Sequence, residues 1–120
     1  MTKFTQEELK VLTKQAKKII PIKVAYYADK MNVVYGRVAI RKQHTRWGSC
    51  SNDGNLNFNA LLVLMPDDVI NYVVIHELAH RKELNHSKRF WAEVEKVMPD
   101  YKEKDKWLKE NGIKYIERLT

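Results

Sequence analysis

Three of the four histidines in this chain lie within eleven consecutive residues, from His76 to His86. His76 and His80 are four residues apart, and residues at that spacing on an α-helix project from one face, a turn apart. Two imidazoles placed in this way can bind one metal ion, and the adjacent Glu77 can reach a bound water rather than the metal itself. The segment therefore predicts a metal centre with hydrolytic chemistry.

His86 is the predicted third ligand, because catalytic zinc takes three protein ligands and keeps one position open. On a continuous helix His86 would point about 240° away from the face that carries His80. We therefore predict that the helix ends between Leu84 and His86, with Asn85 in the left-handed conformation and Ser87 capping the next helix. The spacing indicates one zinc ion per chain, and a purely structural histidine cluster is the alternative.

The segments around these residues have helical patterns. We predict one helix over residues 66–84, which begins at Pro66 and carries the apolar run 73–75 before His76. A second helix is predicted from Ser87 to Met98 and a third from Asp100 to about Gly112, while residues 113–120 are ambiguous. The three tryptophans fit these patterns better as core residues than as a platform for stacking nucleic acid bases.

The N-terminal half is predicted to position this helical part. Thr5 and Glu8 form a capping box, and apolar residues at helical spacing follow until Pro21, where we expect the helix to end. Residues 22–59 favour a small, mostly antiparallel sheet, with strands at 22–27, 33–41, 45–50 and 56–59. A tight turn containing Asp53 and Gly54 joins the last two strands. The expected fold class is α+β.

Composition narrows the classes of protein that remain. The chain has 120 residues, of which 44% are hydrophobic and 31% charged, which is typical of one globular domain over residues 1–120. No apolar run approaches the ~20 residues of a membrane span, and no apolar leader is evident, so we expect a cytoplasmic protein without a membrane partner. Cys50 is the only cysteine, which excludes an internal disulfide and a cysteine-based zinc site. The net charge of +7 favours polyanions, so nucleic acid is a possible partner.

Three residues outside the histidine cluster are further candidates for the site. Arg46 and His44 lie on or beside a predicted strand, where they are candidates for binding substrate or stabilising an oxyanion, with surface ion pairing as the alternative. Tyr101 is a candidate for pointing into the site, with capping or packing as the alternative. Cys50 is expected to be a small buried side chain.

Several motifs occur in a characteristic order: TRWGSCS at 45–51, NFN at 57–59, YVVIHELAH at 72–80, NHSKRFW at 85–91, PDY at 99–101 and WL at 107–108. On these motifs, residues 37–112 resemble the YgjP-like metal-dependent hydrolases, a family classed as zinc metallopeptidases with SprT-like and other zincin relatives. The resemblance implies a zincin-like fold with an N-terminal helix, a small sheet, an active-site helix and C-terminal helices. It also implies His76, His80 and His86 as zinc ligands and Glu77 as general acid and base.

The combined prediction is one zincin-like metallopeptidase domain. It divides into a basic N-terminal helix (1–21), a sheet (22–59) and a helical catalytic part (66–112). The predicted activity is zinc-dependent cleavage of a peptide or protein substrate. Two alternatives stay open, namely zinc-dependent hydrolysis of nucleoside triphosphates and a nucleic-acid-binding module with a structural metal.

Overall fold

A long helix, a small sheet and further helices follow one another along the chain in the computed structural model, which describes residues 2–119. The order is α1 (Gln6–Met31), β1 (Val38–Arg41), β2 (Gly48–Cys50), β3 (Leu56–Asn59), the 3₁₀ helix η1 (Ala60–Leu64), α2 (Asp67–Ala79), α3 (Lys88–Val97), α4 (Tyr101–Asn111) and α5 (Ile113–Ile116). This is the α+β class predicted from the sequence. No helix of the described part is both long and apolar enough to cross a membrane.

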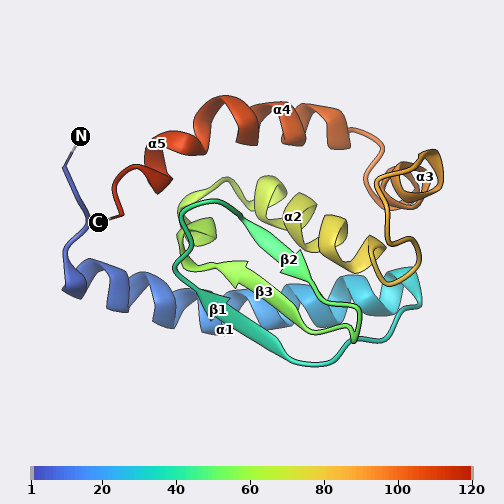
Figure 1. Cartoon of the computed structure of the whole chain (residues 1–120), viewed down its shortest axis with the longest axis horizontal. Coiled ribbons are helices and arrows are strands. Elements are labelled where there is room, and N and C mark those ends of the chain that lie inside the picture. Colours follow the sequence, from blue (N-terminus) through green and yellow to red (C-terminus); the bar gives the residue numbers. More distant parts are fainter. Residues whose placement is uncertain (1, 120) are drawn as a thin grey trace.

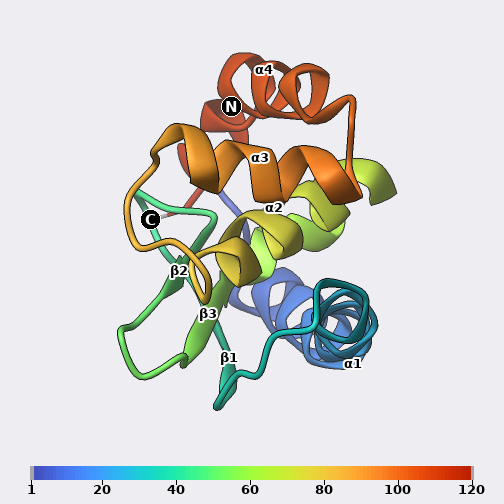
Figure 2. The same ribbon diagram turned by 90° about the vertical axis from the view of Figure 1, so that its right-hand side faces the viewer.

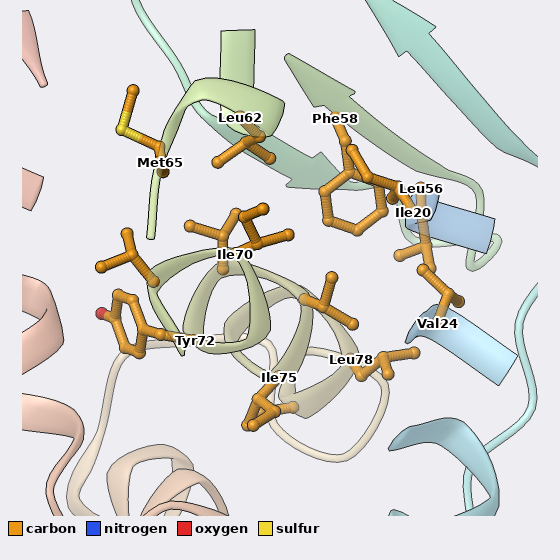
Figure 3. Packing of buried hydrophobic residues seen from close by; sticks show 14 of the residues in the cluster. Ile20, Val24, Leu56, Phe58, Leu62, Met65, Ile70, Tyr72, Ile75 and Leu78 are labelled. Carbon is orange, nitrogen blue, oxygen red and sulfur yellow. The ribbon is translucent and has the colours of Figure 1, made fainter. Parts of the chain in front are cut away.

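Helix α2 lies in the middle of the molecule. Figure 2 shows α1 and the sheet on one side of α2, and α3 and α4 on the other. Figure 3 shows how this arrangement packs, with side chains from α1 and β3 meeting side chains of α2. The residues labelled there are buried, at 5% exposed or less: Ile20, Val24, Leu56, Phe58, Leu62, Met65, Ile70, Tyr72, Ile75 and Leu78. Burial on most of its surface explains why α2 has apolar neighbours immediately before its histidines.

Helix α1 continues ten residues beyond Pro21, so the predicted helix end at Pro21 and the predicted strand at 22–27 are wrong. A proline inside a helix costs about 3 kcal/mol. The continuation buries Val24, Ala28 and Met31 on the same face as Ile20, and burying a Val or Met side chain contributes ~1.5–3 kcal/mol each. Tertiary packing therefore outweighs the local cost of the proline.

Both ends of α1 are capped, the N-terminal end by side chains and the C-terminal end by the backbone at Asn32. The predicted capping box is confirmed, because the Glu8 N–H donates to Oγ1 of Thr5 and the Thr5 N–H donates to Oε1 of Glu8. At the other end Asn32 adopts a left-handed conformation (φ 56°), and the Val33 N–H donates to the Ala28 carbonyl at 3.0 Å. This cap turns the chain toward the sheet.

The sheet has the order β1-β3-β2 and is mixed rather than mostly antiparallel. The predicted turn closes the β2–β3 hairpin, in which Gly54 has a positive φ of 87° and its N–H donates to the Ser51 carbonyl. β1 lies on the other side of β3 and runs parallel to it. The irregular segment 42–47 carries the chain across to β2, so β2 is left as an edge strand. β1 and β2 are also shorter than predicted, whereas β3 has the predicted bounds.

The two ends of the described chain meet in a second, smaller cluster. Phe4 and Leu12 pack there with Ile116 and Leu119, and the Phe4 N–H donates to the Arg118 carbonyl at 2.9 Å. The sequence left residues 113–120 unassigned, and the structure places the short helix α5 at Ile113–Ile116 in this segment. The three tryptophans are partly buried against the cores, as expected for packing residues.

Candidate metal centre

Helix α2 presents His76 and Glu77 in its last turn, and His80 is the residue that caps its C-terminus. The helix ends five residues earlier than predicted, and Asn85 does not adopt a left-handed conformation. Among the described residues, Asn32 is the one non-glycine residue with positive φ. The break is made by tightening the last turn, since the Arg81 and Lys82 N–H groups donate to carbonyls three residues back.

Arg81 holds this turn against the segment before β1 and against the turn of the β2–β3 hairpin. Its Nε donates to the Val34 carbonyl at 2.9 Å and its Nη1 donates to the Asn52 carbonyl at 3.2 Å. A Cβ atom on Gly54 would lie 2.7 Å from the Arg81 guanidinium carbon, so the hairpin turn needs a glycine where this side chain crosses it. Arg81, the residue directly after His80, therefore fixes the position of the hairpin relative to the second histidine.

The chain then returns so that His86 faces the other two histidines. One ring nitrogen from each of His76, His80 and His86 lies within 4.8 Å of the others, so that one metal ion lies within reach of all three. Ser87 caps α3 as predicted, with its Oγ accepting from the Phe90 N–H. Nδ1 of His80 lies 3.2 Å from the Glu83 carbonyl, a contact that fixes the ring and leaves Nε2 for a ligand.

Aromatic side chains from α3 and α4 support the three histidines. Phe90 is fully buried, and its ring centre lies 4.5–5.0 Å from the centre of each imidazole. Trp91 stacks on His86 at 6.0 Å, and Tyr101 stacks on Trp91 at 5.2 Å. Because His86 is the most exposed of the three histidines, this stack compensates for missing contacts on its outer side.

Glu77 is 6% exposed and lies beside the first histidine, with its Oε2 3.2 Å from Nδ1 of His76. The backbone of β2 passes close to it. A Cβ atom on Gly48 would lie 3.0 Å from Cγ and 3.2 Å from Oε2 of Glu77. A side chain at position 48 would therefore displace the Glu77 carboxylate. Glycine at this position leaves enough space for the carboxylate beside β2.

The three histidines and Glu77 line a cavity of about 600 Å³. Its wall is formed by the hairpin, by Arg46 and by the turn at residues 80–86 that carries His80 and His86, called the ligand turn below. The lining residues are Arg46, Gly48, Ser49, Cys50, Ser51, Asn52, His76, Glu77, His80, Leu84, Asn85 and His86. Cys50 is half-buried in this wall, whereas a buried side chain was predicted.

The other predicted substrate contacts lie elsewhere. His44 does not line this cavity, and Tyr101 lines a neighbouring one of about 370 Å³ together with His86 and Trp91. A third cavity, of about 210 Å³, is also lined by Glu77 and Arg46. Sequence reasoning missed Gly48, Phe90 and Arg81, although Phe90 follows His86 by four residues and Arg81 follows His80 directly.

Burial governs the protonation of groups around the site. Desolvation, followed by the neighbouring His76 and His80, lowers the pKa of His86, which favours the neutral imidazole that a metal ion requires. Desolvation also raises the pKa of Cys50, so the thiol stays protonated. The pKa of Tyr72 is raised well above its usual range by burial and by its hydrogen bond to Asp105, so this phenol remains a donor.

The donor set suits a metal ion of borderline softness. Three imidazole nitrogens with no sulfur donor and a flanking carboxylate form the ligand pattern of catalytic zinc sites, in which one coordination position remains open. The residues present therefore fit a metal ion.

Comparisons with known proteins agree with this site. Residues 3–111 match the YgjP-like family, which is described as a metallopeptidase domain. The crystal structure of the metallopeptidase zymogen abylysin of Pyrococcus abyssi is 27% identical, with a TM-score of 0.70, over 78% of this chain and 96% of that chain. The corresponding zymogen jannalysin of Methanocaldococcus jannaschii is 20% identical, with a TM-score of 0.67, over 76% and 94%. None of the curated proteins matches the chain.

Proposed function

Because this chain belongs to the YgjP-like family of metallopeptidase domains, we propose that it cleaves peptide bonds with one zinc ion per chain. The observation that carries the proposal is the convergence of His76, His80 and His86 beside the buried carboxylate of Glu77. The predicted division into a ligand set and a separate acid–base group follows from this arrangement. Three histidines without a cysteine favour a catalytic over a structural site.

A zinc ion in this site would lower the pKa of a water molecule and polarise the scissile carbonyl. Glu77 is the residue to which we assign the proton transfers. It accepts the proton of the attacking water and delivers it to the leaving amine. Its burial and its contact with His76 hold the carboxylate in one position, and the residue lines the cavity. Preorganisation of this kind reduces the cost of reaching the reactive geometry.

The edge strand β2 offers a place for the substrate backbone. β2 pairs with β3 on one side only, and Ser49 and Cys50 line the cavity wall. An extended peptide can add to such an edge through main-chain hydrogen bonds. We therefore propose an extended segment of a peptide or protein as substrate, with Arg46 as its side-chain contact. The assignments of His44 and Tyr101 to substrate stay predictions.

Metal analysis combined with a hydrolysis screen tests this proposal. We expect about one zinc per chain, loss of zinc in His80→Ala, and retention of zinc in His44→Ala, which changes the one histidine outside the cluster. Glu77→Gln should keep zinc and lose on the order of 10²-fold or more in turnover of peptides. Full zinc occupancy in His80→Ala contradicts the ligand set. Hydrolysis of nucleoside triphosphates without any peptide cleavage contradicts the substrate class.

We also propose a binding partner and a cellular location for the enzyme. The lysines of α1 and the net charge of +7 support nucleic acid as an additional partner. That binding should weaken steeply with salt and survive Glu77→Gln. The single cysteine is typical of a reducing compartment, so we propose a cytoplasmic location.

A further inference from the structure

Arg46 is the cationic residue that lines both cavities flanking Glu77. Its side chain is exposed, and within residues 2–119 its guanidinium has no ion pair or hydrogen bond to any carboxylate. We propose that Arg46 makes the enzyme selective for substrates with a carboxylate close to the scissile bond, either an Asp or Glu side chain or a free C-terminus. This inference rests on the proposed peptidase function and names its substrate class.

The charge of the surrounding chain supports an anionic ligand. Residues 30–52 contain five Lys and Arg residues and no Asp or Glu. This stretch supplies β1, β2 and the segment between them, so the part of the chain that carries Arg46 is positively charged and contributes no acid of its own. Positive charge near a cavity attracts negatively charged segments of a substrate and disfavours basic ones.

The backbone that carries Arg46 is held in place by hydrogen bonds from Asn59. Asn59 is fully buried, and its Nδ2 donates to the Arg46 carbonyl at 3.0 Å and to the Gln43 carbonyl at 2.9 Å. The Asn59 N–H donates to the Trp47 carbonyl at 2.9 Å. The guanidinium therefore extends from a fixed point, which reduces the entropy lost when it binds a ligand.

The carboxylates that line the two cavities are those of Asp105 and Glu77. Asp105 in the smaller cavity already accepts from the Tyr72 hydroxyl at 2.9 Å and pairs with Lys109 at 2.8 Å. In the larger cavity Glu77 is the one lining carboxylate among the described residues. That cavity otherwise has polar groups from Ser51, Asn52 and Asn85 along its wall, so the larger cavity is where the substrate carboxylate is expected.

The chemistry of Arg46 distinguishes a carboxylate from a neutral analogue. Its planar guanidinium forms paired, charge-assisted hydrogen bonds with a carboxylate. An amide has the same shape but offers only one acceptor and no charge. We expect acidic peptides to bind and react about tenfold better than their amides, which corresponds to ~1.4 kcal/mol. The preference should shrink with added salt, because the site is open to solvent.

The test uses matched peptides that differ in one group. Asp or Glu is compared with Asn or Gln at each of three positions on either side of the cleaved bond, and a free C-terminus is compared with its amide. These two arms distinguish a side-chain carboxylate from a terminal one. Cleavage is measured as kcat/KM in the wild-type enzyme, and binding as Kd from fluorescence anisotropy in zinc-loaded Glu77→Gln.

Three variants locate the effect. Arg46→Gln should abolish the preference and Arg46→Glu should reverse it in favour of Lys or Arg at the same position. Arg41→Gln removes the same charge from the same acid-free stretch at a residue outside both cavities, and it should keep the preference.

Three results would overturn the role of Arg46. One is equal kcat/KM and equal Kd for acidic and amide peptides in the wild type. Another is an equal loss of preference in Arg41→Gln, which would assign it to the general field. The third is a uniform drop in kcat for all peptides in Arg46→Gln, which would indicate an oxyanion-stabilising residue instead. Failure to cleave any peptide would contradict the proposed function, whereas the anisotropy comparison would still decide the role of Arg46.

Discussion

Replacing Gly48 by Ala places a methyl group beside the carboxylate of Glu77 without touching a metal ligand. The added Cβ would lie 3.0 Å from Cγ and 3.2 Å from Oε2 of Glu77, and 3.3 Å from the Asn57 carbonyl. Ordinary contacts of a Cβ atom lie at about 3.4–4 Å. Because the Asn57 carbonyl is part of the β2–β3 pairing, the Glu77 side chain is the group that must move, by a few tenths of an ångström.

The expected loss of turnover follows from that displacement. A misplacement of ~1 Å in an active site can cost about 10²-fold in rate. A displacement of a few tenths of an ångström therefore predicts a loss of up to about tenfold in kcat, or up to ~1.4 kcal/mol in the activation barrier. Stability should change little, because Gly→Ala at a compatible backbone position stabilises by ~0.4–1 kcal/mol through the unfolded chain, which offsets part of the strain.

Three measurements check this prediction. Zinc content and the thermal unfolding midpoint should match the wild type, while kcat on a peptide substrate falls. In the Glu77→Gln background, Gly48→Ala should cause no further loss, because the two changes act on the same proton transfer. A variant that keeps zinc and full turnover would refute the reasoning, as would an equal loss of rate in the Glu77→Gln background.

Other perturbations should act on the support of the site or on the fold. Phe90→Ala should lower the free energy of unfolding by about 3–5 kcal/mol in denaturant titration and weaken zinc affinity, because it empties the space beneath all three imidazoles; unchanged affinity would contradict a supporting role. Asn59→Ala should cost on the order of 2–5 kcal/mol, measured in the same titration, because it leaves two partly buried carbonyls and the buried Leu61 N–H without their partner. The hydrogen bonds from Thr5 lower the pKa of Glu8 below its ordinary value of 4.5. The stabilisation by Glu8 is therefore complete above about pH 4.5 and lost as the pH falls through the lowered pKa, so Glu8→Gln should be less stable than the wild type at pH 7 and equal to it in strong acid.

Features that depend on neighbouring residues were predictable from the sequence. The capping box of Thr5 and Glu8 and the hairpin turn at Gly54 are each determined by a few adjacent side chains, and both are confirmed. The grouping of His76, His80 and His86 was predictable for the same reason, since the helical spacing brings two of them together. The return of the third required only that the helix end before it.

Features that depend on distant residues were not predictable in this way. A proline usually ends a helix, as was predicted at Pro21. Helix α1 continues because its following turns pack against α2 and the sheet. The place where α2 ends depends on Arg81, whose partners at Val34 and Asn52 lie far away along the sequence. The parallel pairing of β1 with β3 depends on the irregular segment between β1 and β2, which has no strand periodicity to indicate its path.

The meeting of the two chain ends has a practical consequence for handling this protein. Lys3 and Phe4 bond to the carbonyls of Glu117 and Arg118, and Figure 1 shows both ends at one extremity of the long axis, with α3 at the other. An affinity tag, a surface tether or a fused fluorescent protein at either end therefore projects away from the histidines. A short peptide joining the two ends would give a circular permutant whose new ends, opened at the α3–α4 connection around Asp100, leave the hairpin and the ligand turn continuous.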